Sequence, residues 1–236
     1  MDAERSNAIV YADEDNEMKN EVLSQLKKEY TIKELDTGKD AHLSSKGMHF
    51  DLKSYEVENL GHLCILEMNA MLGVMKMETI VLSVETCDMP LFNMDTIDVM
   101  KKHTMLAEMY NSQLTDFDPD AGGGFTAIVE ADSDLPDYES GEHLYDDTRY
   151  KCFYGKTVQG KAQERFDRVS REYLAEYLRQ VRKAPQCDPE AKKQAAMKFA
   201  QGLLDNGGPA VDQFRKLFGD ETTRRLVLKH MYGVID

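Results

Sequence analysis

The chain has 236 residues, of which 42% are hydrophobic, and its mean hydropathy is -0.54. This length suits one domain, and the composition provides a sizeable core inside a soluble surface. The formal net charge of -14 makes the chain a poor candidate for wrapping nucleic acid or for lying on an anionic membrane.

The cysteines and the N-terminal residues indicate in which cellular compartment the protein is expected. The four cysteines are scattered and none has CxxC spacing, so neither a zinc site nor a disulfide framework is indicated. The first residues contain no apolar signal segment, and no apolar run approaches the 18 residues of a membrane span. We therefore expect a cytoplasmic protein, or a protein of the plastid stroma if it is eukaryotic and processed.

The first half of the chain changes from helical to strand periodicity. Residues 14–30 place Met18, Val22 and Leu26 four apart, which predicts an amphipathic helix. From about 48 to 111 the pattern becomes a series of short β-like runs with short joins, which is typical of an antiparallel meander. These runs are HFDLKSYEV, GHLCILEMNA, METIVLSVE, FNMDTIDVM and HTMLAEMYN.

The region after the meander is less regular. Residues 115–142 contain three consecutive glycines among many aspartates, which we interpret as a flexible turn because no P-loop Lys-Ser/Thr follows. Within this loop, 126–130 (TAIVE) is a candidate strand. Residues 149–155 (RYKCFYG) are expected to form the last strand of the sheet.

The last third of the chain is predicted to be helical. Residues 161–184 carry one apolar helical face, and Asp188-Pro189 opens a second helix to about residue 204. A third helix begins at Pro209 and closes at Gly219, before a final helix. We expect a single α+β domain over 1–236, with a helical segment (1–45), a central antiparallel sheet (48–155) and C-terminal helices (161–236).

Charge is unevenly distributed along the chain. Residues 1–118 carry 11 Lys+Arg and 23 Asp+Glu, whereas residues 161–236 carry 15 and 11. The basic tail is either a set of solvated helix faces or a docking face for an acidic partner, with Lys192 and Lys193 among its candidate contacts.

Three predicted strands place a carboxylate on an otherwise apolar face. Alternation puts Asp95 on the same face as Ile97, and the same pattern holds for Glu67 and Glu108. Burial of a carboxylate raises its pKa, so such a group can donate a proton near neutral pH. For each acid alone, a salt bridge or an exposed sheet edge is the alternative explanation, whereas the set of three suggests a functional cluster.

Other kinds of chemistry lack their motifs. There is no GxSxG elbow for a nucleophilic serine, no His-rich spacing for a metal and no GxGxxG after a strand for a dinucleotide. The sequence thus carries acids and no cofactor motif of its own.

Two stretches carry a family resemblance. CILEMNAMLGVMKMETIVLSVETCDMPLFNMDTI resembles the ferredoxin-dependent bilin reductases, whose loop D-[LM]-P-[IL]-F-x-x-D here runs from Asp88 to Asp95. The end of the chain, DQFRKLFGDETTRRLVLKHMYGVID, is similar to the closing helix of that family. The resemblance covers 56–111 and 212–236, and the related red chlorophyll catabolite reductases are a close second.

The resemblance implies an α/β/α sandwich with an open tetrapyrrole between the sheet and the C-terminal helices. It implies no bound flavin or metal, single electrons from ferredoxin or flavodoxin, and protons from carboxylates. Asp95 matches the catalytic aspartate, Glu67 the acid on the neighbouring strand, and Asp205 or Asn206 the Asp/Asn before the closing helices. Arg149 and Lys151 are candidate anchors for the carboxylates of the substrate.

One departure from the family leaves the function open. Some members carry a histidine on the strand before the loop, whereas residues 80–84 here read IVLSV. The resemblance thus implies a bilin reductase in which Asp95 works with Glu67 or Asp205. The alternatives are a non-catalytic tetrapyrrole-binding protein and an interaction module on the same fold.

Overall fold

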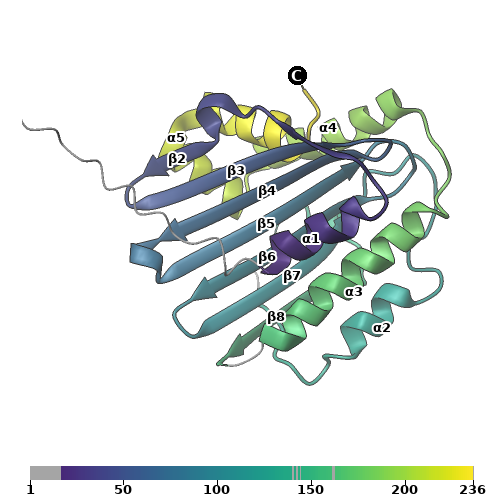
Figure 1. Cartoon of the computed structure of the whole chain (residues 1–236), viewed down its shortest axis with the longest axis horizontal. Helices are drawn as coiled ribbons and strands as arrows, with labels where there is room; N and C mark the ends of the chain where they lie inside the picture. The colour runs from purple at the N-terminus through teal and green to yellow at the C-terminus, as the bar shows by residue number, and fades with distance from the viewer. Residues whose placement is uncertain (1–16, 140, 142, 144, 161–162, 236) are drawn as a thin grey trace, which may run out of the picture.

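A computed structural model describes residues 17–139, 141, 143, 145–160 and 163–235 of the chain. Its centre is one antiparallel sheet in the order β1-β3-β4-β5-β6-β7-β8, with β2 also paired to β3 (Figure 1). The five runs expected to form a meander are its middle strands, so this part of the prediction is confirmed. The strands are β1 (Ile32–Leu35), β2 (His42–Ser45), β3 (Met48–Val57), β4 (Gly61–Ala70), β5 (Met75–Val84), β6 (Leu91–Val99), β7 (Lys102–Tyr110) and β8 (Tyr154–Gln159).

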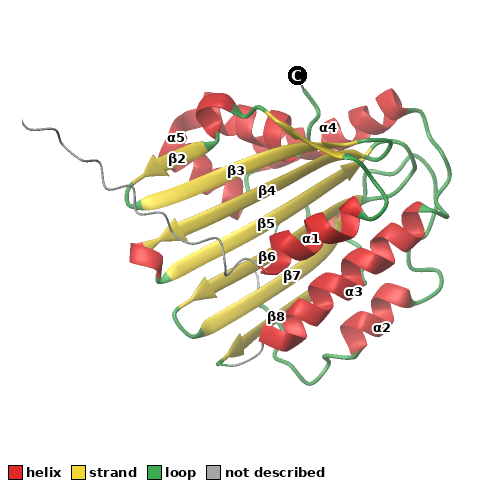
Figure 2. Cartoon of the chain, in the orientation of Figure 1, coloured by secondary structure: helices red, strands yellow, loops and turns green. Residues whose placement is uncertain are grey.

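Helices cover both faces of this sheet, which makes three layers and confirms the α+β sandwich (Figure 2). The face covered by α1, α2 and α3 is called the α3 face below, and the face covered by α4, α5 and η4 is the α4 face. The helices are α1 (Glu17–Lys27), α2 (Gly124–Glu130), α3 (Gln163–Val181), α4 (Pro189–Asn206), α5 (Pro209–Arg225) and the π-helical η4 (Leu226–Met231), with short 3-10 turns at Gly38–Asp40, Met71–Gly73 and Asp146–Thr148.

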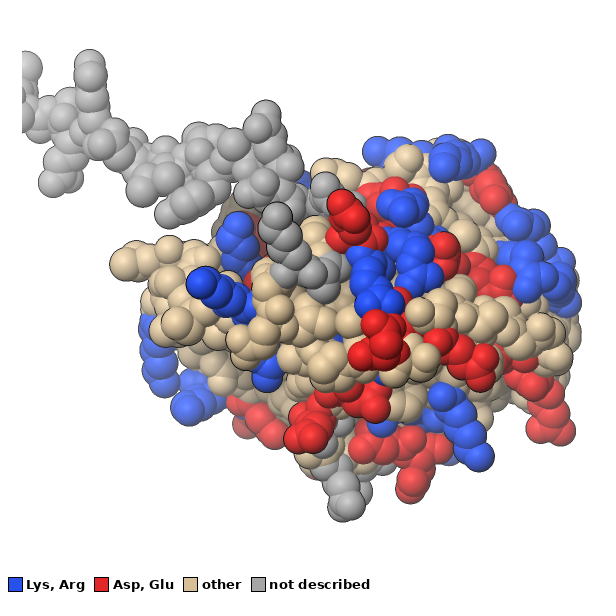
Figure 3. All heavy atoms as spheres, turned by 90° about the horizontal axis from the view of Figure 1, so that it is seen from below, with Lys and Arg blue, Asp and Glu red and all other residues tan. Residues whose placement is uncertain are grey.

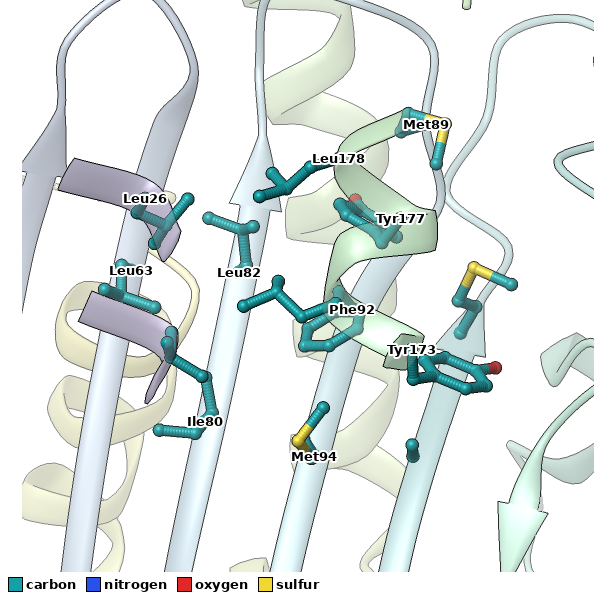
Figure 4. Packing of buried hydrophobic residues seen from close by; sticks show 14 of the residues in the cluster. Leu26, Leu63, Ile80, Leu82, Met89, Phe92, Met94, Tyr173, Tyr177 and Leu178 are labelled. Atoms are coloured by element: carbon teal, nitrogen blue, oxygen red, sulfur yellow. The ribbon is translucent and has the colours of Figure 1, made fainter. Parts of the chain in front are cut away.

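Strand alternation divides the core into two clusters. On β6, Phe92 and Met94 point to the α3 face, where they meet the aromatic side of α3 at Tyr173 and Tyr177 (Figure 4). The hydroxyl of Tyr177 also donates to the carbonyl oxygen of Pro90 at 2.6 Å. This bond ties α3 to the chain just before β6, the strand that carries Asp95.

The α4 face is closed by the end of the chain. Phe50 on β3 contacts Phe214 and Phe218 of α5, with ring centroids 5.6 and 5.5 Å apart. After η4, Gly233 has φ +65, and a Cβ there would lie 2.4 Å from the ring of His62. Only glycine fits this close approach, which lets the last residues pack against the sheet.

The segment before β6 is held by a buried ion pair that the charge pattern did not reveal. Asp88 is fully buried and accepts from the backbone nitrogens of Leu114 and Thr115 at 2.8 and 2.7 Å. The Lys192 ammonium lies 3.4 Å from Asp88 and donates to the Ser112 carbonyl oxygen at 2.7 Å. Lys192 therefore joins α4 to the sheet and is unavailable for docking.

Other basic residues of the C-terminal third are also committed to neighbours. Arg182 pairs with Glu29 at 2.7 Å, and Arg215 contacts Asp220 at 3.1 Å. The ion pairs spread these positive charges over several elements. These two arginines are therefore paired, and the docking of an acidic partner at the basic tail stays a prediction.

Three local expectations were wrong. Residues 126–130 belong to α2, since Gly123 ends the turn in a left-handed conformation and Asp120 accepts from the Phe125 nitrogen at the helix start. The 1–45 segment contains strands β1 and β2 in addition to α1. The last strand begins at Tyr154, so Arg149 and Lys151 precede it.

None of the helices within the described part of the chain has a stretch that is long and apolar enough to cross a membrane.

Candidate active site

Asp95 lies in the middle of β6 with its side chain on the α4 face, where it is half-buried. Thr79 on β5 is its cross-strand partner and donates its hydroxyl to Asp95 Oδ1. Asn93, two residues earlier on the same face, donates its amide to Asp95 Oδ2 at 2.5 Å. Both carboxylate oxygens are thus held by fixed donors, so the group has one defined orientation.

The surroundings of Asp95 favour its protonated form. Burial, followed by the negative charge of Glu108, raises the pKa of Asp95 to about 6, against the opposing effect of the bonds from Thr79 and Asn93. With that pKa, about one carboxyl group in ten carries a proton at pH 7. Asp95 can therefore both give up a proton and regain it near neutral pH.

A second polar cluster lies beside Asp95 on the same face. Glu108 on β7 is the cross-strand partner of Asn93, and its carboxylate accepts from the Tyr110 hydroxyl at 2.7 Å. The Arg149 guanidinium donates to the other Glu108 oxygen at 2.8 Å. Glu108 is thus buried and paired with a guanidinium, whereas the two donors to the half-buried Asp95 are neutral, so Asp95 is the acid of the pair that can exchange a proton.

An apolar strip adjoins these polar groups. Ile97 follows Asp95 on the α4 face, and Leu106 is the cross-strand partner of Asp95. Phe153 lies over Gly155, within 3.3 Å of the position of a Cβ there, and the Arg149 guanidinium is 4.0 Å from the centre of its ring. Ile97, Leu106 and Phe153 are only half-buried, so the strip provides a partly open apolar surface beside the acid.

A cavity of about 470 Å³ lies between α4 and the segments that follow β7 and precede β8. Tyr145 connects the cavity to the acids, because its ring packs edge-on against Tyr110 at 5.6 Å. Burial, followed by the charge of Glu108, raises the pKa of Tyr145 to about 12, so its hydroxyl remains a donor. The cavity is lined by Asn111, Ser112, Gln113, Tyr145, Thr148, Ala195, Lys198, Phe199, Gly202, Leu203, Asn206 and Gly207.

Glu67 was expected to work beside Asp95, but the structure places it on the α3 face. Its carboxylate lies 3.0 Å from the Lys19 ammonium of α1, and its cross-strand partner is Glu78. Burial, followed by the charge of Glu67, raises the pKa of Glu78 to about 7. The sheet backbone separates this acidic pair from Asp95, so we do not assign Glu67 to the same site.

The remaining expected site residues are divided by their position. Asn206 lines the cavity, whereas Asp205 beside it is exposed and accepts from the Gln201 amide at 2.7 Å. Lys151 is exposed in a turn and is absent from the cavity lining. Arg149 reaches the site, but its guanidinium is already paired with Glu108.

Some site residues were missed by sequence reasoning. The residue opposite Asp95 on β5 is Thr79, one position before the stretch in which we looked for a histidine, and it supplies a hydroxyl there. The sequence alone does not provide the register of this pair, because β5 and β6 are joined by residues 85–90 and not by a tight turn. Lys198 and Phe199 gave no signal either, because their position in the cavity depends on how α4 packs.

Among the described residues, no group of three or more His, Cys, Asp or Glu side chains is placed to hold a metal ion.

Comparisons with known proteins add information at the level of the fold. No family model and no curated protein matches this sequence. Among solved structures, the chain is similar to phytochromobilin synthase from tomato in complex with biliverdin, with 10% sequence identity and a TM-score of 0.75. The match covers 92% of this chain and 82% of the other. The fold that the resemblance implied is therefore confirmed, because this chain has the same fold as that synthase.

Proposed function

We propose that this protein is a reductase of a linear tetrapyrrole, which binds on the α4 face beside Asp95. The observation that carries the proposal is a half-buried carboxyl with a pKa of about 6, held by Thr79 and Asn93 next to a partly open apolar strip. A solved protein of the same fold is a synthase in complex with biliverdin. The sequence resemblance to bilin reductases supports the same substrate class.

Asp95 acts as the proton donor in this proposal. Reduction of one double bond adds two electrons and two protons to the conjugated system. An added electron makes the tetrapyrrole more basic, so a neighbouring acid of raised pKa can protonate it. Asp95 gives one proton and recovers it from solvent through its exposed side, and the second proton comes from water.

Residues beside Asp95 and at the cavity orient the substrate in this proposal. The apolar strip formed by Ile97, Leu106 and Phe153 supports one flat face of the tetrapyrrole. Lys198 is exposed at the cavity and supplies a cation for a substrate carboxylate, with Asn206 as a hydrogen-bonding partner. Arg149 acts mainly by holding Glu108, since that pair is already formed.

The electrons come one at a time from a small redox protein, ferredoxin or flavodoxin, as the resemblance to the bilin reductases implies. This part rests on the sequence resemblance. A chain of net charge -14 repels an acidic donor at long range, so the reduction rate should depend on ionic strength.

The test combines binding and turnover. Purified protein is mixed with biliverdin, and the visible spectrum is followed with and without reduced ferredoxin or flavodoxin. We expect a spectral shift on binding and loss of the biliverdin band on reduction.

Asp95→Asn should keep the binding shift but slow reduction by about 10²- to 10⁴-fold. The wild-type rate should fall as pH rises through about 6, because the protonated donor is depleted.

Asp98→Asn is the matched control. It removes the same group from the same strand, but Asp98 lies on the α3 face and pairs with His103 at 2.7 Å. Its turnover should equal that of the wild type. Normal reduction by Asp95→Asn would remove Asp95 from the mechanism. Binding without reduction by either donor would favour the non-catalytic tetrapyrrole-binding protein, and no spectral shift would contradict the substrate class.

A further inference from the structure

One end of the sheet presents large apolar side chains to solvent. The β4–β5 turn exposes Met71, Leu72 and Val74 to 65%, 103% and 43%, and the β6–β7 turn exposes Met100 to 77%. The described residues contain one other exposed large hydrophobic side chain, Leu114, which follows β7 at the opposite end of the sheet. Exposure of this kind is concentrated in two turns, so it is a local feature of the molecule.

The two turns form one surface. Strands β5 and β6 are neighbours, with Met75 opposite Val99, and the Met100 nitrogen donates to the Val74 carbonyl oxygen at 3.0 Å. Both turns lie at the left end of the sheet in Figure 1. Met71, Leu72, Val74 and Met100 are called the apolar tip below.

The backbone of the apolar tip has a conformation that other residue types adopt more easily. Met71, Leu72 and Met100 have φ values of +53, +58 and +58, in the left-handed region that glycine and asparagine favour in hairpin turns. Their side chains bury little surface in return. Fold stability therefore does not explain why apolar residues occupy these three positions.

Lysines surround the apolar tip. Residues 44–50, 69–77 and 99–104, which make the three turns at this end, contain Lys46, Lys76, Lys101 and Lys102 and no acidic residue. The nearest acid along β6, Asp98, is paired with His103. In Figure 3 the left end of the molecule is mostly tan and blue, and red gathers toward the centre and right. An acidic chain thus has a locally basic end around its most exposed apolar side chains.

We propose that the apolar tip inserts into an anionic lipid surface, with the four lysines facing the headgroups. Narrow protruding turns with apolar ends and a basic surround match the chemistry of the membrane interface, where apolar groups enter the acyl boundary. The net charge led us to expect no such binding, but the Debye length is about 8 Å at physiological ionic strength, so the local charge dominates at contact.

The test is sedimentation of the full chain with vesicles of phosphatidylcholine alone and with roughly 30% phosphatidylserine, a content that gives the anionic surface potential on which the proposal depends. We expect binding to the anionic vesicles that weakens as salt is added. The Lys101→Glu/Lys102→Glu variant should bind more weakly by about fivefold or more for each lysine charge removed. Leu72→Gly/Met100→Asn should lose binding at an unchanged or higher melting temperature, because both substitutions suit a left-handed backbone.

Leu114→Ser is the matched control, because it removes an exposed apolar side chain at the other end of the sheet and should bind as the wild type does. Failure of the wild type to sediment with anionic vesicles would overturn the proposal, as would full binding by Leu72→Gly/Met100→Asn. Analytical ultracentrifugation without lipid adds a third outcome. A dimer that the double variant abolishes would assign the apolar tip to a second copy of the chain and overturn the membrane assignment.

Discussion

Replacing Asp95 by asparagine should stabilise the protein at pH 7.5. The pKa of Asp95 rises from its ordinary value of 3.8 to about 6, which corresponds to about 3 kcal/mol of unfavourable free energy in the ionised folded state. The introduced amide keeps an oxygen for Thr79, but the Asn93 amide must turn to present its oxygen instead of its nitrogen. We therefore expect a gain of about 1–3 kcal/mol, or roughly 2–4 °C of melting temperature for each kcal/mol.

The sign of this effect changes with pH in a defined window. Above pH 6 the carboxyl is ionised in both the folded and the unfolded state, so the folded protein bears the full penalty. Below the unfolded pKa of about 3.9 both states are protonated and the penalty is absent. The stability advantage of Asp95→Asn should thus appear as pH rises from about 4 to 6 and then remain constant.

Urea unfolding of wild type and Asp95→Asn at pH 4 and pH 7.5 measures this difference directly. Asp98→Asn controls for the loss of one negative charge from an acidic chain, since its side chain is 42% exposed. A variant that is less stable than the wild type at pH 7.5 would refute the reasoning. An advantage of equal size at both pH values would refute it too, because a packing effect does not titrate.

Three further substitutions test the other assignments. Glu67→Gln should cost about 1–3 kcal/mol, because it removes the carboxylate that Lys19 contacts, and should leave bilin turnover unchanged, since Glu67 is on the α3 face; chemical unfolding and the spectral assay check both. Glu78→Gln should raise the melting temperature at pH 8 and not at pH 4, because burial raises the pKa of Glu78 to about 7. Thermal melts of wild type and variant at both pH values measure this, and an equal gain at pH 4 would contradict it. Lys192→Met should destabilise the protein by about 3 kcal/mol in urea, because it leaves Asp88 buried without its cation; a stable variant with slow ferredoxin-driven reduction would instead support docking at Lys192.

Short-range patterns in the sequence were sufficient for most elements. Side-chain alternation in FNMDTIDVM put Asp95 on a face with Ile97, and the structure has the same alternation. The pair Asp188-Pro189 marked the start of α4, where the Asp188 carboxylate accepts from the Ala191 nitrogen at 2.9 Å. Such signals are reliable because period and caps depend on residues within a few positions of each other.

Local pattern failed where distant contacts outweighed propensity. TAIVE is rich in β-formers, yet it continues a helix whose Phe125 is fully buried against Tyr173 of α3, with ring centroids 4.7 Å apart. The buried Lys192 is an ordinary helical lysine in the sequence, and only the Asp88 carboxylate across the fold explains its burial.

The sequence by itself determined that Asp95 and Glu67 are acids on apolar strand faces, because alternation is a property of each strand. Which of the two faces of the sheet each acid shares was decided only by the tertiary structure, since it depends on the register of β4 against β5 and β6 and on which helices cover each side. Glu67 meets α1 on one face, and Asp95 lies on the other face, the one that carries α4 and the cavity beside it. A shift of one residue in the pairing of two strands moves every side chain to the other face of the sheet. The sequence of one strand therefore does not show on which face the side chains of its neighbour lie.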